Sequence, residues 1–126
     1  MGLAMNYFFL AAGGISAFGL IWHIMIGRTR PFVPPGDAAD RLLQLDAYYG
    51  RHATTVLLAV MALSFAQASR RAAASDLALT VTVLSLTLAA LRLALAIRLR
   101  APRLDIAEWA LPALAGLIGF AGFQFR

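Results

Sequence analysis

The sequence predicts an all-α protein, an integral membrane four-helix bundle. Of its 126 residues, 61% are hydrophobic and 13% are charged, and the mean hydropathy is +0.76. A soluble domain of this length cannot bury so much apolar surface, so we expect the bilayer to act as the solvent. Four apolar runs, separated by connectors rich in arginine or proline, complete the prediction. We expect a single transmembrane domain over residues 1–126.

The first apolar run, about residues 3–26, is long enough to cross a hydrocarbon core of about 30 Å. Arg28 follows this run and no positively charged segment precedes it, so a cleaved signal peptide is not expected. Small residues make one side of the run nearly flat, and we predict close helix packing there at Gly13, Ala17 and Gly19.

A proline-rich connector ends this helix, and Asp37 then has the sequence context of a helix N-cap. Residues 38–48 alternate between polar and apolar at helical spacing, which predicts an amphipathic segment lying partly among the lipid headgroups. We expect the chain to tilt inward near Gly50, and the second span to occupy about residues 48–68.

The remaining two spans are predicted at about residues 77–97 and 106–123. Arg92 lies inside the third span and shares a helical face with a threonine and a serine, so this face should turn away from lipid. The fourth span carries Gly116 and Gly119 on a second smooth face, where we again predict helix packing.

Arginine distribution predicts the orientation of the four spans. Apart from Arg92 inside the third span, seven arginines fall in the first and third connectors or next to them, and three fall in the second connector and at the C-terminus. Positive residues favour the cytoplasmic side, so we expect a bacterial cytoplasmic (inner) membrane protein with its N- and C-termini in the periplasm.

Composition also excludes several kinds of function. The absence of cysteine removes disulfides, thiol nucleophiles and cysteine-based metal sites. No basic run is interleaved with exposed aromatic residues, so no nucleic acid partner is expected. We predict no catalytic residues, because no serine elbow or acid–base–nucleophile order is present, and no metal site, because the carboxylates lie beside arginines that would repel a cation.

The two histidines form the main candidate site. His23 lies four residues before Gly27, and His52 lies four residues after Tyr48, so each is about 6 Å inside the end of its predicted helix. Because one connector joins the two helices, we expect both rings to face each other at one side of the membrane. The candidate ligand-binding residues are His23, His52, Arg92, Tyr48, Thr55 and Arg28.

Several interpretations of this polar cluster stay open. The side chains can hydrogen-bond between helices without any ligand. Two imidazoles at one depth can also ligate the iron of haem b from both sides, and the cationic lining suits a quinone, a lipid or another anionic headgroup. A proton relay through the histidines lacks an acidic residue in mid-membrane to continue it.

The residues around both histidines resemble a known group. His23-x3-Gly27-Arg28, then Pro31, and then Tyr48-x3-His52-x2-Thr55 are similar to the pattern of small four-helix membrane proteins of proteobacteria that have no assigned activity. The likeness covers about residues 19–58. In this chain Gly50 and Arg51 replace a cysteine and a tryptophan of the group. The resemblance implies a bacterial inner-membrane protein and draws attention to the histidines, but it implies no reaction.

The function predicted from sequence is that of an accessory or structural subunit, which packs against itself or against a larger membrane complex through its small-residue faces. Its partners would be the lipid bilayer, other membrane-protein subunits, or further copies of this chain. The alternative is a ligand- or cofactor-binding membrane protein that uses His23 and His52, with haem b or quinone as the candidate cofactors. An enzyme is the least supported class.

Overall fold

The computed structural model describes residues 5–29, 36–71, 74–98, 100 and 106–125. These residues form four helices: α1 (Tyr7–Thr29), α2 (Ala38–Arg70), α3 (Ser75–Arg98) and α4 (Ile106–Gln124). The predicted all-α, four-helix architecture is therefore confirmed for the described part of the chain. Within that part, three helices (α1, α2 and α3) are long and apolar enough to cross a membrane.

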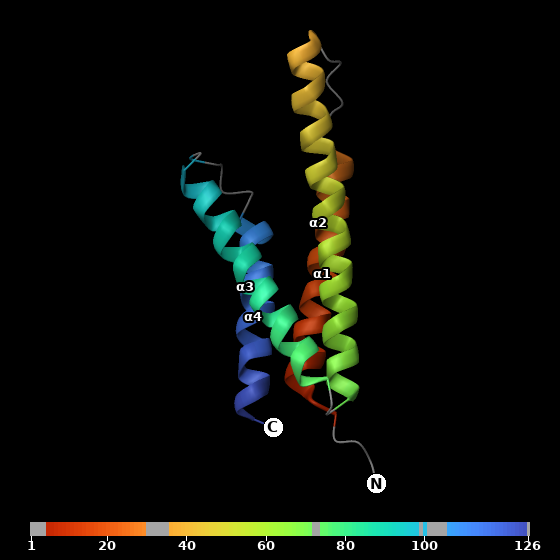
Figure 1. Cartoon of the computed structure of the whole chain (residues 1–126), viewed down its shortest axis with the longest axis vertical. Coiled ribbons are helices and arrows are strands. Elements are labelled where there is room, and N and C mark those ends of the chain that lie inside the picture. The colour runs from red at the N-terminus through yellow and green to blue at the C-terminus, as the bar shows by residue number, and fades with distance from the viewer. Residues whose placement is uncertain (1–4, 30–35, 72–73, 99, 101–105, 126) are drawn as a thin grey trace.

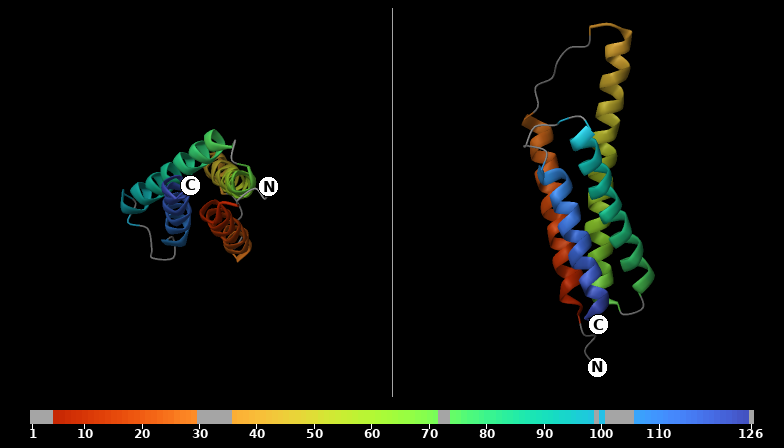
Figure 2. Two further views of the ribbon diagram at one scale, coloured as in Figure 1. Left: turned by 90° about the horizontal axis from the view of Figure 1, so that it is seen from below. Right: turned by 90° about the vertical axis from the view of Figure 1, so that its left-hand side faces the viewer.

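The helices form an antiparallel bundle in which α1 lies between α2 and α4, and α4 packs against α3 (Figure 1, Figure 2). Both ends of the described chain lie at the same end of the bundle. One core joins all four helices and includes Phe9, Phe65, Val81 and Ala115. This core connects the four described helices to one another.

Helix α2 differs from the sequence expectation. The predicted interfacial segment and the second span form one uninterrupted helix of 33 residues, which passes through Gly50. At 1.5 Å per residue it is about 50 Å long, and its first turns extend past the other helices (Figure 1). Its start is the predicted one, because the Asp37 side chain accepts a hydrogen bond of 2.8 Å from the Asp40 N–H.

Helix α1 begins later than predicted because Asn6 caps it. The Asn6 side-chain oxygen accepts hydrogen bonds from the N–H groups of Phe8 and Phe9, at 3.1 and 3.2 Å. Its side-chain amide donates to the Gly122 carbonyl at 3.0 Å, and its backbone N–H donates to the Ser69 carbonyl at 2.9 Å. One asparagine thus ties the start of α1 to the C-terminal ends of α2 and α4.

The predicted small-residue faces are used inside the bundle. Gly13 lies against α2, where an added Cβ would be 3.3 Å from the Phe65 Cβ. Gly19 lies against Leu111 of α4, whereas Ala17 is only half-buried. These positions therefore pack helices of the same chain against one another.

Helix α4 makes the closest approaches. A Cβ added at Gly116 would lie 2.6 Å from the Leu86 Cδ2 of α3, and one added at Gly119 would lie 2.7 Å from the Thr82 Oγ1. One added at Gly122 would lie 2.6 Å from the Phe9 Cε1 of α1. Such distances are below any ordinary carbon contact, so α4 takes up its position only because these residues have no side chain.

We expect Gly119→Ala to destabilise the bundle by about 1–3 kcal/mol, because the new methyl group collides with a buried aromatic ring and a buried threonine. Gly14→Ala is the matched control, since Gly14 has nothing within 4 Å of an added Cβ. The midpoint of unfolding in detergent micelles measures the difference. Equal midpoints for the two variants would contradict the packing argument.

Candidate functional site

The candidate site is a pocket at the end of the bundle opposite the two chain ends. Helices α2 and α3 lie close where α3 begins and diverge toward this end (Figure 1). A hollow of about 440 Å³ lies there, between residues of all four helices. We call it the polar pocket; its polar or charged lining side chains are His23, Arg51, Thr54, Arg92 and Glu108.

His23 is held by a clasp between α1 and α2. The residue is buried, with 8% of its surface exposed, and its Nε2 lies 3.1 Å from the Arg51 carbonyl oxygen. In the opposite direction, the Arg51 guanidinium donates to the Gly27 carbonyl at 3.4 Å. The lack of a side chain at Gly27 brings the Arg51 stem close, because an added Cβ would be 3.3 Å from the Arg51 Cδ. The clasp fixes Arg51 at the pocket wall.

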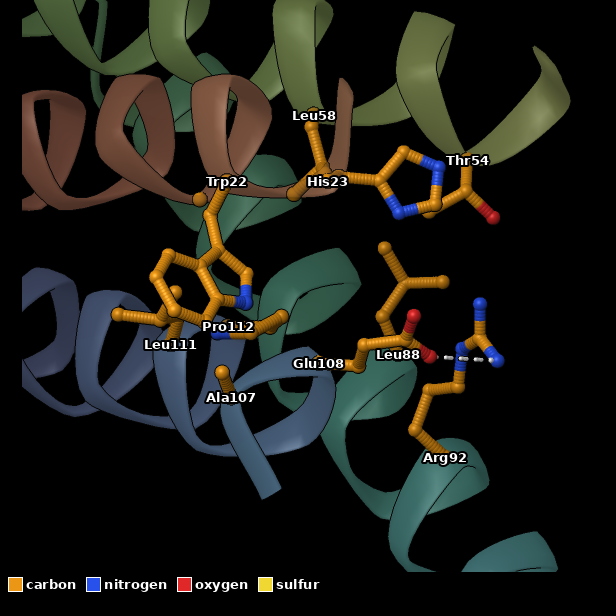
Figure 3. A pocket seen from close by; sticks show the side chains of 11 residues that line it. Trp22, His23, Thr54, Leu58, Leu88, Arg92, Ala107, Glu108, Leu111 and Pro112 are labelled. Atoms are coloured by element: carbon orange, nitrogen blue, oxygen red, sulfur yellow. Dashed lines mark ion pairs between the residues drawn. The ribbon is translucent and has the colours of Figure 1, made fainter. Parts of the chain in front are cut away.

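Arg92 lines the same pocket from α3, as part of an ion pair with α4. Its Nη1 lies 3.1 Å from Glu108 Oε2, and the exposed fractions of the two side chains are 38% and 14%. Figure 3 shows the pair beside Leu88, on the far side of the pocket from His23. The polar pocket therefore holds two arginines and one glutamate, and Arg51 has no carboxylate partner among the described residues.

A smaller hollow of about 40 Å³ continues the polar pocket inward and shares five of its lining residues. Its other walls are mostly apolar and include Trp22, Leu58, Leu111 and Pro112 (Figure 3). Beyond it, Ser85 is fully buried and donates a 2.7 Å hydrogen bond to the Pro112 carbonyl. The site is thus amphipathic, with charges at its wide end and hydrocarbon at its floor.

The expected pairing of the two histidines does not occur in the structure. His52 is exposed and does not line the polar pocket. Its ring instead packs edge-to-face on Tyr48, with the ring centroids 4.3 Å apart. His23 meets the backbone of Arg51 where a second imidazole was expected. The physical reason is that α2 turns Arg51 and Thr54 toward α1, which leaves His52 on its outer side.

Of the remaining residues predicted for the site, Thr55 lies beside the clasp, and Tyr48 and Arg28 lie away from the pocket. Thr55 donates to the Arg51 carbonyl at 3.0 Å, so it supports the clasp from within α2. Tyr48 and Arg28 are exposed and do not line the pocket. Pro31, which belongs to the resemblance pattern, lies outside the described residues.

Arg51 and Thr54 were not among the residues predicted for the site. A signal for them was present in α2, whose buried residues Leu58, Met61 and Phe65 recur every three or four positions. Continuing that spacing backward gives Thr54 and then Arg51. The buried stripe of α2, rather than the histidine itself, marks the face that lines the site.

The arrangement suits some ligands better than others. A haem held between two histidines needs both rings on one site, and His52 is on another surface. Among the described residues, no group of three or more histidine or carboxylate side chains is placed to hold a metal ion.

Comparisons with protein-family models, curated proteins and solved structures find no match to this chain.

We expect His23→Phe to destabilise the protein by about 1 kcal/mol, because it keeps the ring volume but removes the interhelical hydrogen bond. His52→Phe should change stability by less than about 0.5 kcal/mol, since His52 is exposed. Thermal unfolding in detergent compares the two variants. A larger loss for His52→Phe would mean that the outer histidine, and not the clasp, supports the fold.

Proposed function

We propose that this chain is an integral protein of a bacterial cytoplasmic membrane that binds an anionic amphiphile in its polar pocket. The three helices of sufficient length and apolarity support the membrane location. In this proposal α4, which packs against α1 and α3, is the fourth span. The excess of arginine in the first and third connectors supports periplasmic termini. In this orientation the polar pocket opens at the cytoplasmic side.

The charge of the pocket is the observation that supports this function. Two guanidinium groups and one carboxylate leave one positive charge in excess among the side chains of the pocket. An anionic headgroup on Arg51 and Arg92 would neutralise that excess. Guanidinium groups bind phosphate and carboxylate through two parallel hydrogen bonds, which suits them to this role.

The shape of the site supports an amphiphile rather than a free anion. The apolar floor around Trp22, Leu58 and Leu111 offers contact to a hydrocarbon chain. Residues of α2 and α3, among them Ala47, Gly50, Leu91 and Leu95, line the polar pocket, and the hydrocarbon chain of the ligand would continue between these two diverging helices into the bilayer (Figure 1). A lipid or a fatty acid combines both parts.

The quinone and accessory-subunit interpretations fit the polar pocket less well than an anionic amphiphile does. A neutral quinone would use the same floor but would leave the excess charge uncompensated. The role of an accessory subunit was inferred from small-residue faces, and Gly13, Gly19, Gly116 and Gly119 contact helices of this same chain. That role, like the resemblance to the proteobacterial group, stays a prediction.

Quenching of Trp22 fluorescence by brominated lipid tests the proposal, in a Trp109→Phe background that leaves one tryptophan. Brominated phosphatidylglycerol should quench Trp22 more strongly than brominated phosphatidylcholine. Arg51→Gln and Arg92→Gln should each weaken the binding of phosphatidylglycerol about tenfold, the loss of one hydrogen bond to a charged group. Arg70→Gln, exposed at the opposite end of α2, is the control and should have no effect.

Glu108→Gln should have the opposite effect on the binding of phosphatidylglycerol. Removing this carboxylate frees Arg92 and raises the positive charge of the pocket, so phosphatidylglycerol should bind several-fold more tightly. Brominated oleate and a ubiquinone serve as further ligands, which separate a phosphate, a carboxylate and a neutral head. Stronger quenching by ubiquinone than by either anion, with no effect of the arginine substitutions, would refute the anion site.

A further inference from the structure

The outer face of α2 carries a stripe of mostly exposed residues between Leu42 and Leu63. Its large apolar members are Leu42, Leu45, Tyr49, Val56 and Leu63, whose exposed fractions lie between 61% and 74%. Their positions alternate in steps of three and four residues when His52 and Ala59 are included. This is the a/d pattern of a coiled coil, with a mean spacing of 3.5 residues.

This stripe lies opposite the buried stripe that packs α2 into the bundle. At 100° per residue, Leu45 and Leu63 are both about 140° from Leu58, which is buried. Lipid can cover the part of the stripe beside the other helices. The first turns of α2, however, extend past the other described helices (Figure 2). Leu42 and Leu45 belong to this part of α2 and are exposed.

Two charged residues next to the stripe indicate which partner packs against it. Arg41 precedes Leu42 and therefore takes heptad position g, and Asp46 follows Leu45 and takes position e. In a parallel two-stranded coiled coil, a residue at g faces the residue five positions later, at e, on the other strand. Arg41 and Asp46 are five positions apart, and neither forms an ion pair among the described residues.

We propose that two copies of this chain associate through their α2 helices as a parallel coiled coil. Arg41 of each copy then pairs with Asp46 of the other, so a twofold axis along the helices produces both ion pairs at once. Copies inserted with the same orientation in one membrane present α2 in parallel, as this pairing requires. The interface is on the outer side of α2 and leaves the polar pocket on the inner side free, so the proposal is independent of the ligand.

Cysteine cross-linking tests the geometry, because the chain has no cysteine of its own. Leu45→Cys, at a d position, should form disulfide-linked dimers in membranes on oxidation with copper phenanthroline. Leu43→Cys is the matched control: Leu43 is 68% exposed, against 61% for Leu45, but it lies off the stripe. A high yield for Leu45→Cys and a low one for Leu43→Cys supports the coiled coil. Equal yields, or no dimer at either position, would overturn it.

Charge reversal tests the register. Arg41→Asp alone places like charges opposite each other twice per dimer, and should weaken dimerisation roughly tenfold. Asp46→Arg alone should do the same, and the double variant should restore the wild-type dimer. The measurement is the dimer fraction in detergent against protein concentration, by light scattering. Failure of the double variant to recover association would exclude the parallel pairing, as would unchanged association of both single variants.

Discussion

Three glycines on one face of α4 set the distance between the helices of this bundle. Each receives a side chain from another helix: Leu86 at Gly116, Thr82 and Phe65 at Gly119, and Phe9 at Gly122. Where lipid surrounds a protein, burying apolar surface between helices gains little, so close van der Waals contact has to hold the helices together. The same glycines position the start of α4, and with it Glu108, next to Arg92 of α3.

The helices pack tightly at the end of the bundle where the described chain begins and ends, and more loosely at the opposite end. At the tight end, Asn6 links three helix ends through its backbone and side chain, and the aromatic rings of Phe9 and Phe123 pack against each other. At the loose end α2 and α3 diverge, and the charged residues of the polar pocket collect in the space between them. Close helix packing and the polar pocket thus lie at opposite ends of the same helices.

The number of helices could be predicted from the sequence, because each apolar run is long and each connector contains proline or arginine. The start of α2 was also predicted correctly, from Asp37. The histidine pairing failed for a geometric reason. Counting residues from a helix end gives the depth of a side chain, but the direction in which it points depends on how the helix is rotated. A step of one residue turns the side chain by about 100°, and the packing of Leu58, Met61 and Phe65 decides that Arg51 rather than His52 faces α1. Likewise, the glycines were recognisable as packing residues, whereas their partners depended on the tertiary arrangement.

In the proposed binding mode, the hydrocarbon chain of the ligand lies between α2 and α3, whose residues line the polar pocket. A molecule that enters there arrives by diffusion in the plane of the leaflet and does not have to leave the bilayer for water. Occupancy then follows the mole fraction of the ligand among the surrounding lipids, and the volume of the aqueous phase has no influence on it. A protein of this kind would report the composition of its own membrane.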